Sequence, residues 1–249
     1  MYIILSPARN TALRPFPGVQ QQEPLFLREA AEIVETLKTY NAWELESLLD
    51  VNPDRAFELQ VDFQRFSVDI PGEPALTSYS GAAYRNMSPG DFTTEGFAFA
   101  QEHLRILSAL YGLLRPADGI LPHRLGIKRE FTIDGHNLYA FWGDKLYQAL
   151  YENGGIVINL ASLDYAKFIL PHMKPGDEMI HCRFLQRKPD GIRSTVATVR
   201  AARGQMTRFI VKNRITSPEG IKDFDWDGYR FIPNSSDPVN FVFVREQNV

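Results

Sequence analysis

Ile156-Val157-Ile158-Asn159-Leu160 is an apolar run of strand length, interrupted by one amide side chain. A continuous apolar run of this kind is typical of a strand that is covered on both faces of a sheet. The amino-terminal run from Tyr2 to Leu5 has a similar character and is closed by Ser6-Pro7. These two segments predict buried strands, and a further strand is expected over residues 75–79.

Helices are expected between these strands. Apolar residues recur at helical spacing from Leu27 to Leu37, and Asn52-Pro53 supplies the N-cap and the first residue of another helix. Thr93 or Thr94 caps a long amphipathic helix that we expect to continue to Gly112. A further helix is expected from about Asn137 to Tyr151.

The carboxyl-terminal part predicts a hairpin, a basic helix and two last strands. The turn residues Lys188-Pro189-Asp190-Gly191 separate strand-like runs at 179–184 and 192–199, and a basic helix follows over about 201–214. The last strands are expected near 229–231 and 241–244. Because strands and helices are interspersed without strict alternation, we predict an α+β fold. It would be a compact, mixed α/β single domain over residues 1–249 rather than a doubly wound sheet.

The composition excludes several classes of protein. A chain of 249 residues with 44% apolar residues can form one large core, burying about three quarters of its extended surface. Cys182 is the single cysteine, which excludes an intramolecular disulfide and metal sites built from several thiolates. The sequence shows no signal peptide and no apolar run near the roughly 18 residues that span a bilayer. We therefore expect a cytoplasmic protein with no membrane partner.

Basic residues are concentrated in one segment. Residues 181–215 contain nine Lys and Arg against one Asp, although the whole chain has a formal net charge of -3. Such a local excess is typical of an anion-binding face, because the field at a site depends on the charges near it. The alternative is that these cations form surface ion pairs with the acidic remainder, and the sequence leaves both interpretations open.

Familiar catalytic motifs are missing from the sequence. GxGxxG, GxxxxGK[ST], HExxH and GxSxG do not occur, and the five histidines are scattered. Carboxylates and histidines do not lie at ligand spacing within any one segment, so no metal site is predicted. Catalytic residues and a cofactor stay unassigned.

Polar residues follow several of the expected strands, which is the second functional indication. Side chains just past strand ends converge on one rim of a sheet, where they can reach a ligand. The alternative is that the serines among them only cap helices or form turns. The candidate pocket residues are Ser6, Arg9, Tyr79, Ser80, Tyr84, Asp144, Asn159, Ser162 and Lys167.

Several longer blocks carry a family resemblance over nearly the whole chain. They include Ser6-Pro7-Ala8, Tyr79-Ser80-Gly81-Ala82-Ala83-Tyr84, Leu110-Tyr111-Gly112-Leu113-Leu114-Arg115-Pro116, Phe141-Trp142-Gly143-Asp144, Asn159-Leu160-Ala161-Ser162 and Ala202-Arg203-Gly204. With these blocks in matching order, the sequence resembles the YaaA peroxide-stress family. The resemblance implies a cytoplasmic bacterial protein of the hydrogen peroxide response, associated with lowering free intracellular iron and with DNA protection and recombination-linked repair.

The same resemblance implies a compact fold with a basic cleft that binds duplex and branched DNA through a helix-hairpin-helix element. The best candidate for this element is the expected long helix together with Leu110-Tyr111-Gly112-Leu113 and the residues after Arg115-Pro116. Leu114 stands where a second glycine of the usual hairpin signature would be.

Two classes of function follow. The first is sequence-nonspecific DNA binding, with phosphate contacts from Arg105, Arg115, Arg124, Arg203, Arg208, Lys212 and Arg214. The second is an enzyme that acts on a phosphorylated or nucleotide-like small molecule in the polar cleft, with Lys167 as a base or cation.

Overall fold

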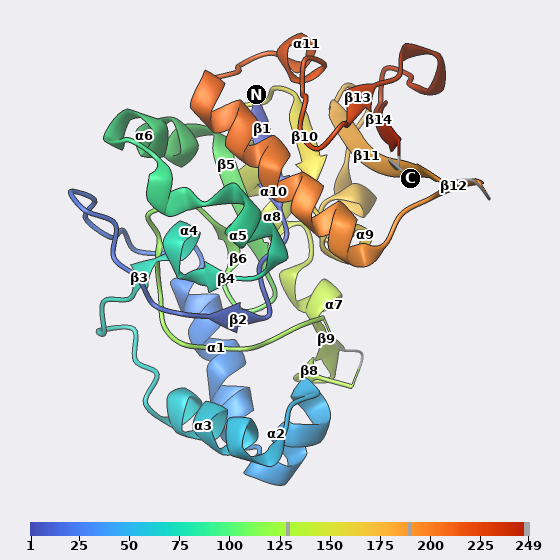
Figure 1. Ribbon diagram of the computed structural model, residues 1–249. Helices are drawn as coiled ribbons and strands as arrows, with labels where there is room; N and C mark the ends of the chain where they lie inside the picture. Colours follow the sequence, from blue (N-terminus) through green and yellow to red (C-terminus); the bar gives the residue numbers. More distant parts are fainter. Residues whose placement is uncertain (128–129, 189–190, 247–249) are drawn as a thin grey trace.

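The buried run at residues 156–160 forms β10 (Val157–Leu160), and all four of its residues are buried. β10 pairs in parallel with β1 (Tyr2–Leu5), with Ile4 opposite Asn159. These elements are taken from a computed structural model that describes residues 1–127, 130–188 and 191–246 (Figure 1). Both strand predictions are confirmed, and the two strands lie side by side within the main sheet.

The main sheet has eight strands within the described residues, in the order β13-β14-β11-β10-β1-β5-β6, with β12 paired to β11. The strands from β14 to β5 run parallel, and β6, β12 and β13 pair antiparallel at the margins. Their bounds are β5 (Leu104–Ser108), β6 (Gly112–Leu114), β11 (Met179–Lys188), β12 (Gly191–Arg193), β13 (Arg230–Phe231) and β14 (Asn240–Glu246). The mixed α/β fold is confirmed, but its sheet is mostly parallel.

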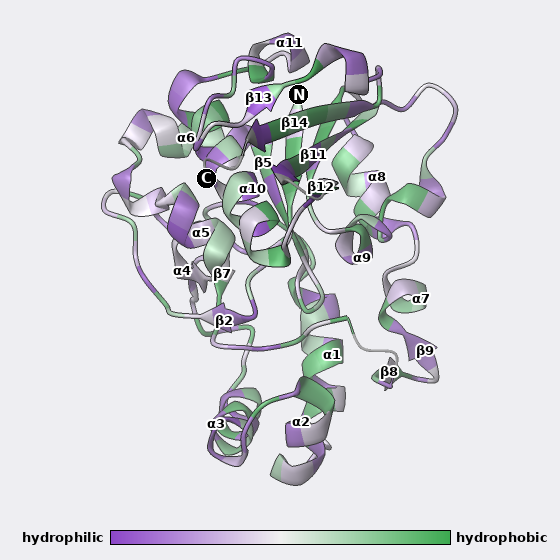
Figure 2. Ribbon diagram, turned by 45° about the vertical axis from the view of Figure 1, so that its right-hand side comes forward, coloured by the Kyte–Doolittle hydropathy of each residue, from purple (hydrophilic) through white to green (hydrophobic). Residues whose placement is uncertain are grey.

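Helices cover both faces of this sheet. Figure 2 shows α6 (Thr94–His103) and α10 (Val196–Asn213) on one side of the central strands, with α8 (Lys145–Tyr151) and α9 (Leu163–Ala166) on the other. The sequence predicted an α+β fold instead of this arrangement, in which helices cover both faces of one sheet. The irregular crossovers between parallel strands hid it, because they contain several short helices and small strand pairs instead of one helix each.

The remaining elements lie mostly in these crossovers. The helices are α1 (Leu27–Lys38), α2 (Ala42–Leu49), α3 (Pro53–Gln64), α4 (Ala75–Ser78), α5 (Ala82–Met87), α7 (Leu138–Trp142) and α11 (Pro218–Ile221), with 3-10 turns at Pro89–Asp91, Leu170–His172 and Pro233–Ser235. The small antiparallel pairs are β2 (Asn10–Thr11) with β4 (Tyr79–Ser80), β3 (Glu73–Pro74) with β7 (Gly119–Ile120), and β8 (Thr132–Ile133) with β9 (His136–Asn137). No helix in the described residues is both long and apolar enough to cross a membrane.

The predicted long helix from Thr93 to Gly112 is wrong in its second half. Thr93 does cap α6, because its hydroxyl accepts the Gly96 N–H at 3.1 Å, but the helix ends at His103. The chain continues as β5 and returns antiparallel as β6, so a β-hairpin stands where the helix-hairpin-helix element was expected. Residues 106–114 are all buried, and complete burial removes the periodicity that separates a strand from a helix.

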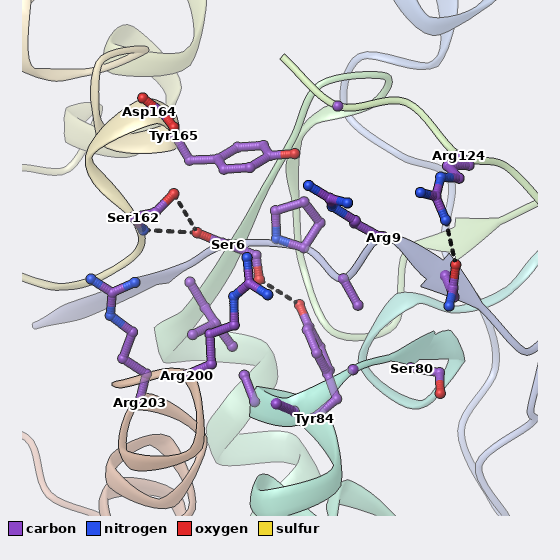
Figure 3. A pocket seen from close by; sticks show the side chains of 18 of the residues that line it. Ser6, Arg9, Ser80, Tyr84, Arg124, Ser162, Asp164, Tyr165, Arg200 and Arg203 are labelled. Carbon is purple, nitrogen blue, oxygen red and sulfur yellow. Dashed lines mark hydrogen bonds between the residues drawn. The ribbon is translucent and has the colours of Figure 1, made fainter. Parts of the chain in front are cut away.

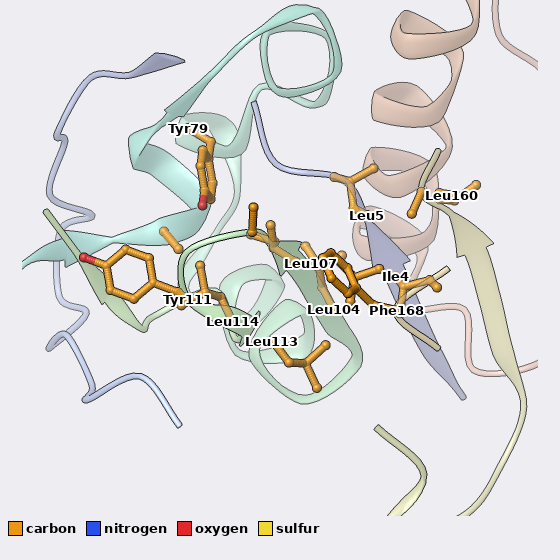
Figure 4. Close-up of a cluster of buried hydrophobic side chains, with 14 of the residues drawn as sticks. Ile4, Leu5, Tyr79, Leu104, Leu107, Tyr111, Leu113, Leu114, Leu160 and Phe168 are labelled. Atoms are coloured by element: carbon orange, nitrogen blue, oxygen red, sulfur yellow. The ribbon is translucent and has the colours of Figure 1, made fainter. Parts of the chain in front are cut away.

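The side chains of this hairpin fill the core beside β1. Figure 4 shows Leu104 and Leu107 packed near Ile4, with Leu113 and Leu114 from the returning strand next to them. These leucines recur at spacings that an amphipathic helix would also produce. Because both faces of the sheet cover these leucines, they lack the alternation of apolar and polar residues that would indicate a strand.

Three other expectations are corrected. Residues 75–78 form the short helix α4 rather than a strand, and the expected helix over 137–151 is split at Gly143, whose φ of +50° ends α7. The hairpin of β11 and β12 is confirmed, with Lys188 opposite Gly191, although Pro189 and Asp190 lie outside the described residues. Its second strand ends at Arg193, since Thr195 caps α10.

Helices α5 and α10 pack with their backbones in contact, and one glycine permits it. A Cβ atom on Gly204 of α10 would overlap the carbonyl oxygen of Ala83 in α5. Because the obstructing atom belongs to the backbone, it cannot move aside as a flexible side chain would. Gly204 therefore sets the distance between the two helices.

We expect Gly204→Ala to lower the free energy of unfolding by about 2–3 kcal/mol, because α10 must move away from α5. Thermal denaturation should show this as a fall in Tm of roughly 5–10 °C. Gly90→Ala is the matched control, since nothing lies within 4 Å of a Cβ at Gly90. Equal Tm values for the two variants would contradict the proposed role of Gly204.

Candidate functional site

The chain reverses its direction of travel across the sheet at β1. It passes from β1 to β5 on one side and then from β5 to β10 on the other. The helices that precede these two strands, α6 and α8, accordingly cover opposite faces (Figure 2). In open α/β sheets, ligands bind outside the carboxyl ends of the strands at such a reversal. Ser6 and Ser162 lie just beyond the carboxyl ends of β1 and β10.

A cleft of about 370 Å³ opens at this position, which is the size of a small-molecule site. Residues 49–50 at the end of α2 and five further segments form its wall (Figure 3). The five segments are the loop after β1 (6–10), the segment of β4 and α5 (80–85), the loop 124–127, the residues after β10 (160–165) and the first turns of α10. The cleft therefore combines parts of the chain that are far apart in sequence.

Hydrogen bonds fix the floor of the cleft around Ser6. The Ser162 N–H donates to Ser6 Oγ at 2.8 Å, and the Ser6 hydroxyl is 3.4 Å from Ser162 Oγ, to which it donates. The Tyr84 hydroxyl donates to the Ser6 carbonyl at 3.1 Å. Burial raises the pKa of Tyr84, so its hydroxyl stays protonated. Ser162 occupies the N-cap position of α9 without a side-chain capping bond within the described chain, so capping does not account for its hydroxyl.

Arginine dominates the charge of the cleft. Among the lining residues that the structure describes are five arginines and two carboxylates, namely Arg9, Arg85, Arg124, Arg200, Arg203, Asp50 and Asp164. Arg9 lies 3.8 Å from Asp50, and both side chains are about 70% exposed, so this pair adds little stability. The positive charge of the cleft is therefore only partly balanced by its own acidic residues.

Arg203 has the most unusual environment of the five. Its Nε atom is buried and has no hydrogen-bond partner among the described residues. Burial lowers the pKa of its guanidinium. Burial also raises the pKa of the nearby Cys182 thiol to about 12, so the thiol is neutral and cannot balance the charge. A buried donor without a partner costs free energy, and an anion in the cleft would balance the charge of this guanidinium.

Comparison with known proteins assigns the family. The model of the peroxide stress protein YaaA family matches residues 1–235. The chain is 36% identical to a UPF0246 protein of Lactobacillus johnsonii, over 98% of this chain and 97% of that relative. It is 38% identical to a UPF0246 protein of Saccharophagus degradans, over 99% and 100%, respectively.

The chain belongs to the YaaA peroxide stress protein family.

In this YaaA family member, the structure brings together about half of the residues that the sequence singled out. Those that line the cleft are Ser6, Arg9, Ser80, Tyr84 and Ser162 from the pocket set, with Arg124 and Arg203 from the phosphate set. Arg124 is held in place by hydrogen bonds to Asn10 Oδ1 at 3.0 Å and the Asp50 carbonyl at 3.1 Å.

The other pocket candidates lie outside the lining of this cleft. Tyr79 is buried behind it, and Asn159 Oδ1 accepts the Ala161 N–H at 2.8 Å, which fixes the turn leading to Ser162. Asp144 accepts a hydrogen bond from Gln148 along α8, and Lys167 is exposed.

Three of the expected phosphate contacts bind the protein's own groups. Arg105 donates to the carbonyls of Gln101 and Leu104, and Arg115 pairs with the fully buried Asp118 at 2.9 Å. Arg208 donates to the carbonyls of Met87 and Ser88 and lies 3.3 Å from Asp91. Lys212 and Arg214 are exposed at the carboxyl end of α10.

The candidate set omitted several lining residues. Arg85 and Asp50 carry no sequence pattern that separates them from ordinary surface charges. Arg200 does have one, because it lies three residues before Arg203 on the same helix and so shares its face. In the part of the chain that the structure describes, no group of three or more His, Cys, Asp or Glu could hold a metal ion.

His123 directly precedes Arg124 in the same loop, and its side chain is buried. Its Nδ1–H donates to the Leu121 carbonyl at 2.8 Å, and its Nε2 lies 3.4 Å from the Tyr79 hydroxyl. Burial lowers the pKa of His123 from 6.5 to about 4, so the imidazole is neutral in the folded protein near pH 7.

Because His123 binds its proton more weakly when folded, its contribution to stability is complete above pH 6.5 and is lost as the pH falls toward 4. We expect the free energy of unfolding to fall by about 3 kcal/mol more in the wild type than in His123→Gln over this interval. Urea denaturation at a series of pH values measures the difference. Parallel pH profiles for the two proteins would contradict a neutral, buried His123.

Proposed function

We propose that this protein acts in the peroxide stress response by binding a phosphorylated small molecule of nucleotide size in its arginine-lined cleft. The observation that carries the proposal is Arg203, a partly buried arginine that lines the cleft, with an unpartnered Nε and no carboxylate paired with it among the described residues. An oxygen of a phosphate supplies both the charge and the acceptor that this group lacks. Guanidinium groups bind phosphate through paired N–H donors, which suits a site formed mainly by arginine.

Neighbouring groups support the same chemistry. Arg200 lies on the same face of α10 and adds a second cation beside Arg203. The Ser162 hydroxyl lies in the same cleft and accepts a hydrogen bond from the Ser6 hydroxyl, so its own proton can be donated to a phosphate oxygen. The cleft volume of about 370 Å³ admits a mononucleotide-sized ligand but not a duplex.

We expect adenosine 5′-monophosphate at a hundredfold excess over its Kd to raise Tm by roughly 5–10 °C. Arg203→Met should weaken this binding by roughly 10- to 100-fold, because it removes a charged hydrogen-bond donor. The unliganded variant should melt no lower than the wild type, since methionine replaces a buried polar atom that has no partner. Differential scanning fluorimetry and calorimetry measure both quantities.

Lys212→Met is the matched control, because it removes an exposed cation of the same helix outside the cleft. It should leave nucleotide binding unchanged. Equal losses in the two variants, or no Tm shift with nucleotides and sugar phosphates, would refute binding in the cleft. Phosphorus NMR of the incubated mixture reports whether the ligand is also converted, as the enzyme hypothesis requires.

Sequence-nonspecific DNA binding is the second candidate function, and the length of α10 favours it. The helix has 18 residues, which corresponds to about 27 Å. It carries Arg200 and Arg203 at one end, with Lys212 and Arg214 at the other. A ligand confined to the cleft would leave the second pair unused. Lys212 lies nine residues after Arg203, on the opposite face of the helix, so a DNA strand that uses both would have to cross α10 instead of following one face. Protection and repair of DNA, and any effect on free iron, would then follow from binding.

For DNA, we expect Lys212→Met and Arg203→Met each to lower affinity and to reduce the slope of log K against log salt by about one. Fluorescence anisotropy with labelled duplex and four-way junction at several salt concentrations measures this. A salt slope that Lys212→Met leaves unchanged would rule out a DNA path that includes the carboxyl end of α10. The Lys212 variant thus separates the two candidate functions.

A further inference from the structure

The labelled arginines of the cleft form two groups on opposite sides of it. Figure 3 shows Arg200 and Arg203, both from α10, on one side, with Arg9 and Arg124 on the other. The members of each group affect one another electrostatically. After burial, Arg9 is the largest influence that lowers the pKa of Arg124, and Arg200 also lowers the pKa of Arg203. Cations that repel one another in this way create a favourable place for an anion.

Neutral groups separate the two pairs. In the close view, the Arg200 side chain reaches up beside Ser6 and Tyr84, and the Tyr165 ring points toward Arg9 from the other side (Figure 3). Burial raises the pKa of Tyr165, as it does that of Tyr84, so both phenols stay protonated. The space between the ends of the Arg200 and Arg9 side chains thus offers aromatic surface and hydroxyl groups.

We propose that the cleft recognises a small molecule with two phosphate groups separated by an uncharged middle part. Arg200 and Arg203 bind one phosphate, and Arg9 and Arg124 bind the other. The proposal rests on the proposed function above and specifies its ligand class. The proposal requires that two phosphates joined directly to each other engage only one of the two arginine pairs.

The two ends differ in strength. Arg203 is partly buried with an unpartnered Nε, so its phosphate contact is shielded from solvent. The side chain of Arg9 is about 70% exposed and already lies near Asp50. A screened, exposed cation contributes less to affinity than a shielded one. Arg200 and Arg203 therefore contribute most of the affinity, whereas Arg9 and Arg124 contribute selectivity for ligands with a second phosphate.

Two isomeric probes test the spacing directly. Adenosine 3′,5′-bisphosphate and adenosine 5′-diphosphate contain the same atoms and similar charge, but only the first has its phosphates apart. By isothermal titration calorimetry, we expect the bisphosphate to bind about tenfold more tightly than the diphosphate, a factor that corresponds to 1.4 kcal/mol. Adenosine 5′-monophosphate serves as the single-phosphate reference.

The Arg9→Met variant tests the second end. It should weaken the bisphosphate several-fold and leave the monophosphate unchanged, whereas Arg203→Met should weaken all three probes. Arg9 is preferred to Arg124 for this test, because Arg124 also holds Asn10 and the Asp50 carbonyl in place. A short single-stranded oligonucleotide, with phosphates on both sides of each nucleoside, shows whether the preferred source is a strand or a free small molecule.

The outcomes separate this inference from the function on which it rests. The two-ended cleft would be overturned if the diphosphate bound as tightly as the bisphosphate. Equal effects of Arg9→Met on monophosphate and bisphosphate would also overturn it. Either result would still be consistent with a site for one phosphate. Failure of all three nucleotides to bind at millimolar concentration would overturn nucleotide binding itself.

Discussion

The position of the cleft follows from the enclosure of β1. This strand pairs with β5 on one edge and β10 on the other, and Ile3, Ile4 and Leu5 are fully or almost fully buried. A strand enclosed in this way can present polar groups only beyond its ends. The crossovers that lead to β5 and to β10 pass over opposite faces of the sheet. Neither crossover therefore covers the carboxyl end of β1. Ser6 lies at this opening and is held there by Tyr84 and Ser162.

The sequence was informative where burial or chemistry left a local pattern. It predicted the strands β1 and β10, the N-caps Asn52 and Thr93, and the polar residues after the strands that meet at the cleft. It could not place the end of α6, because uniform burial removes the difference between helical and extended periodicity. It also could not show that the sheet is mostly parallel. That property depends on which distant strands pair, and the intervening crossovers are irregular.

Charge patterning alone did not distinguish functional arginines from structural ones. Arg105, Arg115 and Arg208 satisfy backbone carbonyls or carboxylates that would otherwise be left without donors. The partners of Arg105 and Arg115 cited here lie within four residues of the arginine, whereas those of Arg208 lie more than a hundred residues away in sequence, where no sequence spacing identifies them. Arg200, Arg203 and Arg85 meet because Gly204 lets α10 approach α5 to backbone contact. The absence of a side chain at Gly204 therefore allows Arg200 and Arg203 of the basic helix to reach the cleft.

Arg203 connects the stability of the fold with the chemistry of the site. A buried guanidinium needs an anion and hydrogen-bond acceptors, and it could obtain them from a carboxylate, a thiolate or a ligand. The thiol of Cys182, the single cysteine of the sequence, stays protonated because burial raises its pKa, and no described residue accepts from Nε. The unliganded protein therefore carries an unfavourable interaction that an oxyanion would relieve. A cation placed in this way binds more strongly than one on the surface, since ligand binding also removes an energetic cost that the free protein bears.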